Sequence, residues 1–214
     1  YIDKTKEIYR LLQGKYYFYA RPRRFGKSLM LSTIKAIYEG KKELFKGLWI
    51  ENKWDFSNVH PVIHVGFSSI GHRKIGLEKA IKQTLKRLAQ EQNIKFESED
   101  YVTQFGKLIR KTASKKGKIF LLIDEYYKPI IDYLGKEIAQ AEENRSILKS
   151  FYSVIKDSDP YIEFLMITGV SKFSKVSIFS ELNNLTDITF HRRYQTLTGI
   201  TQEELETNFV EEIG

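Results

Sequence analysis

A short apolar run that leads into a basic, glycine-containing turn is the feature that most constrains how this chain can fold. Residues 16–20 are apolar or aromatic, residues 21–28 read Arg-Pro-Arg-Arg-Phe-Gly-Lys-Ser, and an amphipathic segment begins at Lys27. A strand that enters a Gly-Lys-Ser turn and continues as a helix places backbone N–H groups where they can bind phosphate oxygens. The sequence therefore predicts a phosphate-binding loop between a strand over 16–20 and a helix over 27–39, with Gly40 ending the helix.

A second apolar run ends in two adjacent carboxylates. Residues 118–123 precede Asp124 and Glu125, and the run shows no polar alternation. This pattern is typical of a central parallel strand that helices cover on both faces. Open α/β sheets bind their ligands at the carboxyl ends of such strands. The pair predicts that Asp124 helps to hold Mg²⁺ and that Glu125 orients and deprotonates an attacking water.

Strand and helix patterns alternate along the rest of the chain. Further strands are predicted over 61–67 and 161–168, and helices around 77–88, 101–109, 148–155 and, after a Thr201 cap, 202–212. The segment 171–198 is expected to be irregular. This alternation favours a three-layer α/β/α sandwich with a mainly parallel central sheet. We expect the whole chain, 1–214, to form one domain, because it contains no convincing internal linker.

Composition narrows the classes of partner. Lys plus Arg is 35 against 27 for Asp plus Glu, which gives a net charge of +8 and favours polyanionic partners such as nucleic acid. Lysine-rich helix faces that only keep the chain soluble explain the charge equally well. The chain has no cysteine, which excludes disulfides and thiolate metal sites and is compatible with the cytoplasm. No apolar stretch approaches the roughly 18 residues of a membrane span, so no membrane partner is expected.

The ends of the chain suggest a fragment. It begins at Tyr1 rather than at Met, and it stops at Gly214 soon after a helical pattern. We expect the C-terminal region of the full-length protein to be missing.

The phosphate loop defines the candidate nucleotide site. Gly26 would let the backbone approach the phosphates, Lys27 would bridge the β- and γ-phosphates, and the Ser28 hydroxyl would ligate Mg²⁺. Thr168, at the end of the fourth strand with Ser171 beyond it, could place a hydroxyl near the γ-phosphate. The predicted ATP-binding residues are Arg23, Arg24, Phe25, Gly26, Lys27, Ser28, Leu29 and Thr168.

Each of these motifs also has a plain structural explanation. A Gly-Lys-Ser turn can be a basic surface turn that caps a helix, and two carboxylates can simply begin a loop. Arg21, Arg23 and Arg24 can contact phosphates or nucleic acid, or stay solvated. A hydroxyl at Thr168 can cap the turn that follows its strand.

Several stretches resemble the predicted AAA-ATPase family of bacteria and archaea. The most specific are the Arg-Pro-Arg-Arg-Phe-Gly-Lys-Ser string at 21–28 and Asn-Asn-Leu-Thr-Asp-Ile-Thr at 183–189. That family carries arginine, like Arg21 here, where phosphate loops usually have their first glycine. The remaining similar stretches bring the resemblance to nearly the whole chain and lie at 1–5, 123–130, 168–171 and 197–201.

The resemblance implies an AAA/ASCE-type P-loop NTPase fold in which another strand separates the Asp124 strand from the strand over 16–20. It also implies that the bound nucleotide is ATP. Together with the roles of the two motifs, this gives ATP and Mg²⁺ as the predicted cofactors and Lys27 and Glu125 as the predicted catalytic residues. Members often continue into a restriction-endonuclease-like domain, which implies a link between ATP use and nucleic-acid processing. The chain departs from the family pattern at Tyr127 and Gly66, where the family usually carries Asp. Losing two acidic groups would weaken Mg²⁺ handling or leave a binding-only domain.

We therefore expect a Mg²⁺-dependent ATPase. Hydrolysis normally needs an arginine, supplied in cis or by a neighbouring subunit, so a second copy of the chain is a candidate partner. The candidates are Arg145, Arg192 and Arg193. The main alternative is a non-hydrolysing nucleotide-sensing or nucleic-acid-binding module. A kinase-type transferase fits less well, because Glu125 adjoins Asp124 and water needs a base.

Overall fold

Five parallel strands form one sheet in the part of the chain that the structure describes. The computed structural model describes residues 2–170, 179, 182 and 184–210. The strand order is β2-β3-β4-β1-β5, so β4 separates β1 from β3, as the family resemblance implies. The strands are β1 (Tyr16–Ala20), β2 (Val62–Gly66), β3 (Ile119–Asp124), β4 (Ile162–Gly169) and β5 (Thr186–Asp187).

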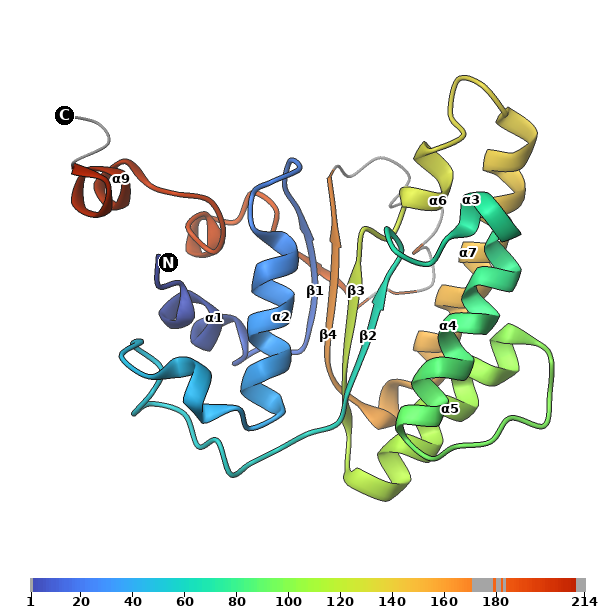
Figure 1. Cartoon of the computed structure of the whole chain (residues 1–214), viewed down its shortest axis with the longest axis horizontal. Helices are drawn as coiled ribbons and strands as arrows, with labels where there is room; N and C mark the ends of the chain where they lie inside the picture. The colour runs from blue at the N-terminus through green and yellow to red at the C-terminus, as the bar shows by residue number, and fades with distance from the viewer. Residues whose placement is uncertain (1, 171–178, 180–181, 183, 211–214) are drawn as a thin grey trace.

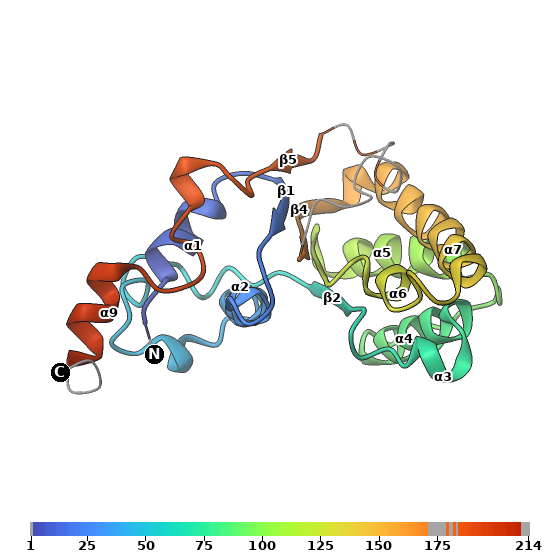
Figure 2. The same cartoon turned by 90° about the horizontal axis from the view of Figure 1, so that it is seen from above.

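Helices cover both faces of this sheet (Figures 1 and 2). On one face lie α1 (Thr5–Leu11) and α2 (Lys27–Tyr38), and on the other α4 (Leu77–Glu91), α5 (Tyr101–Lys116) and α7 (Ile138–Asp157). The short helices α3 (His72–Ile75) and α6 (Lys128–Ile131) follow β2 and β3, and α9 (Gln202–Asn208) lies on the α1 side. Short 3₁₀ helices span Lys42–Phe45, Asp159–Tyr161 and Arg192–Tyr194. The predicted three-layer α/β/α sandwich is confirmed. None of the described helices has both the length and the apolar character that crossing a membrane requires.

Alternate residues of the central strands supply two separate cores. Tyr17 of β1 and Phe120 of β3 pack with α1 and α2, whereas their neighbours Phe18 and Leu121 pack with α5 and α7. Successive side chains of a strand point to opposite faces, and here both faces are covered. Every position of β1 and β3 is therefore buried, which explains why their sequences show no alternation.

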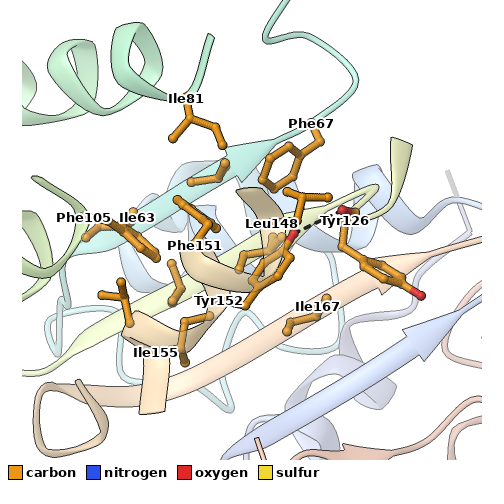
Figure 3. Packing of buried hydrophobic residues seen from close by; sticks show 14 of the residues in the cluster. Ile63, Phe67, Ile81, Phe105, Tyr126, Leu148, Phe151, Tyr152, Ile155 and Ile167 are labelled. Atoms are coloured by element: carbon orange, nitrogen blue, oxygen red, sulfur yellow. Dashed lines mark hydrogen bonds between the residues drawn. The ribbon is translucent and has the colours of Figure 1, made fainter. Parts of the chain in front are cut away.

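Aromatic packing fixes α7 against the turn that follows β3 (Figure 3). The rings of Phe105 on α5 and Phe151 on α7 stack with centroids 4.2 Å apart, and Phe67 meets Phe151 edge-on at 5.8 Å. The buried Tyr152 hydroxyl donates a hydrogen bond of 3.2 Å to the backbone carbonyl of Tyr126. The residues just after the Asp124–Glu125 pair are thereby anchored to the helical layer.

Most predicted element boundaries agree with the structure within a few residues, and the exceptions have local causes. The final helix ends at Asn208, because Phe209 leaves the helical region with φ −131°. Residues 211 and 212 of the predicted helix lie outside the described residues. Its predicted Thr201 cap is confirmed as a capping box with Glu204. Helix α1 was not predicted, and α7 begins at Ile138, well before the apolar spacing from 148. Helix α5 continues to Lys116, beyond the predicted range of 101–109, because its last turns are polar and carry little apolar periodicity. The segment predicted as irregular contains β5, which is only two residues long.

Candidate functional site

The phosphate loop joins β1 to α2 at the carboxyl edge of the sheet. Gly26 caps α2 with φ 82°, a left-handed conformation that glycine adopts without steric cost. A Cβ at Gly26 would meet nothing within 4 Å, so conformation rather than space favours glycine there. Arg24 also has a positive φ, 67°. Such conformations cost a non-glycine residue free energy and are concentrated at ligand-binding loops.

The amine of Lys27 lies inside this loop. It donates hydrogen bonds of 2.9 Å to the carbonyls of Arg21 and Pro22, and it lies 3.7 Å from a carboxylate oxygen of Glu125. The Lys27 side chain is only 4% exposed. A buried charge is tolerated only when it is paired and hydrogen-bonded, and Lys27 meets both conditions. The structure thus brings the two predicted catalytic residues together.

Asp124 receives two hydroxyl groups from different segments. Ser28 Oγ donates to Asp124 Oδ2 at 2.5 Å, and Thr168 Oγ1 donates to Oδ1 at 2.5 Å. Thr168 is fully buried and Asp124 is 8% exposed. Carboxylate and hydroxyl oxygens are the hard donors that Mg²⁺ prefers. The donor set of Ser28 and Asp124 therefore fits the metal ion that the sequence predicts.

Glu125 is held in an unusual backbone conformation. Its φ is 56°, and its carbonyl accepts a hydrogen bond of 2.9 Å from the N–H of Lys128, at the start of α6. The next residue, Tyr126, donates its N–H to the carbonyl of Thr168 at 3.2 Å. A left-handed conformation at a glutamate persists only when its surroundings enforce it. These backbone contacts do so, and they leave the Glu125 carboxylate beside Lys27.

The two departures from the family pattern flank these carboxylates. Gly66 stands opposite Asp124 in the β2–β3 register, and the Tyr127 hydroxyl lies 3.5 Å from Glu125 Oε2. A Cβ at Gly66 would meet nothing closer than Ser69 Oγ at 3.8 Å, so the glycine leaves open space beside Asp124. The acidic groups that this chain lacks would thus have been neighbours of the predicted metal-binding and catalytic residues.

An apolar cavity of about 320 Å³ adjoins the loop on the α1 side. Three of its lining side chains are large, apolar and partly exposed: Phe25, Leu29 and Ile200, at 44%, 55% and 55%. The far wall comes from residues 197–200, which are tied to the loop by a hydrogen bond of 3.2 Å from Gly199 N–H to the Phe25 carbonyl. Four predicted ATP-binding residues, Arg24, Phe25, Gly26 and Leu29, therefore line this cavity. Residues 197–201 are among the stretches that resemble the family, but the sequence assigns them no role. No local sequence pattern indicates that they contact the phosphate loop.

The predicted arginines are dispersed. Arg21 donates to the carbonyl of Thr189 and lies over the Tyr19 ring at 4.8 Å, so its guanidinium has protein partners. Arg23 is exposed on the loop. Arg193 lines a cavity with Lys15 at the amino end of β1, the opposite end from the phosphate loop. Arg145 pairs with Glu142 on α7 at 3.1 Å.

Ser171, the other hydroxyl predicted near the γ-phosphate, lies outside the described residues.

A second titratable cluster links the segments after β2 and β3. His72 Nε2 of α3 lies 3.1 Å from Asp132 Oδ2, and Arg73 Nε lies 3.3 Å from the same oxygen. Lys128 also contacts Asp132. Burial, together with the positive charges of Lys128 and Arg73, lowers the pKa of His72 below its ordinary value, although Asp132 acts to raise it. Burial alone would raise the pKa of Asp132, but Lys128, Arg73 and His72 together hold it below its ordinary value.

Comparison with known proteins gives one family match and one similar protein. Residues 1–179 match the family model described as Predicted AAA-ATPase. A protein of Azotobacter chroococcum mcd 1, described as an uncharacterized protein in the vnfD 5′ region, is 43% identical over 217 residues. The match covers 100% of this chain but 42% of that protein, so the chain spans less than half of its relative. No solved structure matches the chain.

Proposed function

Because the chain belongs to the predicted AAA-ATPase family, we propose that it binds ATP with Mg²⁺ and hydrolyses it to ADP and phosphate. One arrangement carries this proposal. Ser28 and Thr168 both lie 2.5 Å from Asp124, and Lys27 lies 3.7 Å from Glu125. Asp124 and Thr168 lie at the carboxyl ends of β3 and β4, Glu125 follows β3, and Lys27 and Ser28 begin the helix that follows β1. A parallel sheet of this kind binds its ligands at this edge.

Binding would use the loop and the start of α2. The N–H groups of the first helical turn would donate hydrogen bonds to the phosphates, and the helix dipole would favour their negative charge. Lys27 would exchange its contacts with the Arg21 and Pro22 carbonyls for contacts with phosphate oxygens. Ser28 and Asp124 would hold Mg²⁺ directly or through its waters, and the bound ion would neutralise charge on the phosphates.

Hydrolysis would depend on Glu125. Its carboxylate accepts a proton from a water molecule while the water oxygen attacks the γ-phosphorus. The bond between the γ-phosphorus and the bridging oxygen breaks, and ADP leaves with that electron pair. Thr168 keeps Asp124 in place beside this step through its 2.5 Å hydrogen bond. An arginine from a second copy of the chain would complete the site, since Arg193 lies at the far end of β1.

The apolar cavity beside the loop is evidence in favour of a substrate that carries an aromatic base, as ATP does. It opens beside Gly26, the residue that caps the phosphate-binding helix. Cofactor pockets are mostly apolar, with few polar groups. The exposed faces of Phe25, Leu29 and Ile200 would lose contact with water when a base enters.

A binding-only module is the second candidate, and a specific observation favours it. Gly66 and Tyr127 stand beside Asp124 and Glu125, at positions where acidic residues would assist the metal ion. Thermal stabilisation by Mg²⁺ and ATP without phosphate release would identify this case.

Coupling to nucleic acid is a further part of the proposal, and it rests on the net charge of +8. Binding to DNA or RNA that weakens steeply as salt rises would support an electrostatic contact. The relative extends well beyond the length of this chain, so the activity of a whole protein of that size is a proposal as well.

The decisive experiment is phosphate release from ATP, measured with and without Mg²⁺ and over a range of protein concentrations. We expect Mg²⁺-dependent turnover that rises more than linearly with protein concentration as copies supply arginines to one another. The Lys27→Ala protein, purified in the same way, controls for contaminating ATPases. A chain that binds no Mg²⁺–nucleotide, or that binds it without turnover, contradicts the proposed hydrolysis.

A further inference from the structure

Tyr127 is a buried polar residue that contacts both the end of β4 and the proposed catalytic base. Its side chain is 2% exposed. Its hydroxyl accepts a hydrogen bond of 2.5 Å from the backbone N–H of Val170, and it lies 3.5 Å from Glu125 Oε2. The hydroxyl therefore bridges the backbone just after β4 to the carboxylate just after β3.

The direction of these contacts follows from the chemistry of a phenol. The Val170 N–H can only donate, so the Tyr127 oxygen accepts there and its own proton remains for another acceptor. Among the described residues, the Glu125 carboxylate is an acceptor within reach of it. Burial, and after it the negative charge of Glu125, raise the pKa of Tyr127 well above its ordinary value. The phenol thus remains a proton donor at any pH at which the protein would work.

The hydroxyl has little freedom to move, because the ring is wedged in place. Tyr127 meets the ring of Tyr126 edge-on, with centroids 4.8 Å apart. Both rings press against Gly169, where an added Cβ would lie 2.6 Å from a carbon of each ring. Interiors packed this closely hold a side chain in one arrangement.

We propose that Tyr127 is a positioning residue whose hydroxyl holds the Glu125 carboxylate in the orientation from which it accepts the proton of the attacking water. The inference rests on the proposed ATPase function. With this role for Tyr127, residues at the end of β4 orient both carboxylates. Thr168 hydrogen-bonds to Asp124, and the Val170 N–H holds the Tyr127 hydroxyl that contacts Glu125. At position 127, where the family pattern usually has an aspartate, this chain thus has a tyrosine hydroxyl that orients the proposed catalytic base, Glu125.

The first test is Tyr127→Phe, which keeps the ring and removes the hydroxyl. We expect kcat for ATP to fall about 10-fold, because a catalytic group that loses its orientation loses rate. KM and the affinity for ATP stay within about twofold, because Tyr127 is not among the residues proposed to contact the nucleotide. The matched control is Tyr101→Phe on α5, which removes a hydroxyl bonded to the Ile147 carbonyl at 3.3 Å and leaves kcat unchanged.

The second test separates positioning from general support of the fold. In a Glu125→Gln background, Tyr127→Phe should cause no further loss of rate under single-turnover conditions, because its partner carboxylate is gone. A further loss in that background overturns the inference, as does an unchanged kcat for Tyr127→Phe in an otherwise active protein. In both of these cases the ATPase proposal stands. A wild-type chain without turnover overturns both.

Discussion

The hydroxyl of Ser28 lies 2.5 Å from a carboxylate oxygen of Asp124, although 96 positions of sequence separate the two residues. Ser28 lies at the start of α2, which follows β1, and Asp124 ends β3. Strands β1 and β3 are not neighbours, because β4 lies between them. The contact therefore reaches across the end of β4. Thr168, near the end of that strand, donates a hydrogen bond to the other carboxylate oxygen of Asp124. The candidate site therefore depends on the relative position of three strand ends.

Lys27→Ala should abolish detectable ATP binding. The substitution removes the buried amine proposed to contact the phosphates and leaves Glu125 without its partner at 3.7 Å. Titration calorimetry measures the loss, and circular dichroism checks that the chain still folds. The control is Lys35→Ala, since Lys35 is an exposed lysine on the same helix that pairs with Glu39. ATP affinity equal to that of the wild type in Lys27→Ala would remove this residue from the site.

Glu125→Gln should bind Mg²⁺–ATP normally but turn it over about 10²–10⁴-fold more slowly, the usual contribution of a general base. An amide keeps the size of the side chain but cannot accept the proton of water. Phosphate release and nucleotide affinity are measured on the same preparation. Glu142→Gln, on the exposed face of α7, is the matched control. A Glu125→Gln protein that releases phosphate at the normal rate would show that another group is the base.

Ile200→Gln should weaken ATP binding about 10-fold while tripolyphosphate binds as before. Loss of apolar contact from one side chain of this size corresponds to about 1.5 kcal/mol, or roughly tenfold in affinity. Tripolyphosphate has no base, so it reports on the phosphate loop alone. Val59→Gln changes an equally exposed apolar residue that does not line the cavity. Equal losses for both ligands would show that the cavity does not receive the base.

Two glycine substitutions should destabilise the fold for different reasons. Gly26→Ala forces alanine into φ 82°, which costs about 1–2 kcal/mol, although the space around it is open. Gly169→Ala has to displace two tyrosine rings, and overpacking of this kind costs about 1–3 kcal/mol or more. Urea unfolding measures both. Gly26→Asn should lose less stability than Gly26→Ala, because asparagine tolerates the left-handed region. The reverse order would contradict the assigned conformation.

Stability should fall as pH drops below about 6.5, the ordinary pKa of histidine. In the folded chain the pKa values of His72 and Asp132 both lie below their ordinary values, so the unfolded chain binds more protons. The free energy of unfolding is therefore highest above the unfolded pKa of histidine and declines as acid is added. His72→Gln should flatten the decline between pH 7 and 5, whereas His191→Gln, at an exposed residue, should not. An unchanged slope in His72→Gln would exclude the His72 contribution.

Strands whose positions are all buried could be predicted from sequence, and so could the meeting of the two motifs at strand ends. Contacts between distant segments that carry no such motif could not. Strand β1 was predicted with its observed boundaries because an unbroken apolar run admits few other structures. The convergence of Lys27, Ser28, Asp124 and Glu125 follows from two motifs at strand ends, although their chemical roles remain predictions. By contrast, Arg21 contacts Thr189, which lies 168 positions away, and no local pattern indicates that contact. Helix α1 was missed because it is seven residues long with only three of them buried.

The contact between Gly169 and the two rings at 126 and 127 also limits how this lineage can diverge. A related protein with a larger side chain at 169 must have a smaller side chain at 126 or 127. Otherwise the backbone at the end of the fourth strand has to move. Substitutions at these three sites should therefore occur together rather than singly. An alignment in which glycine is lost while both bulky neighbours persist would point to a rearranged strand end in those proteins.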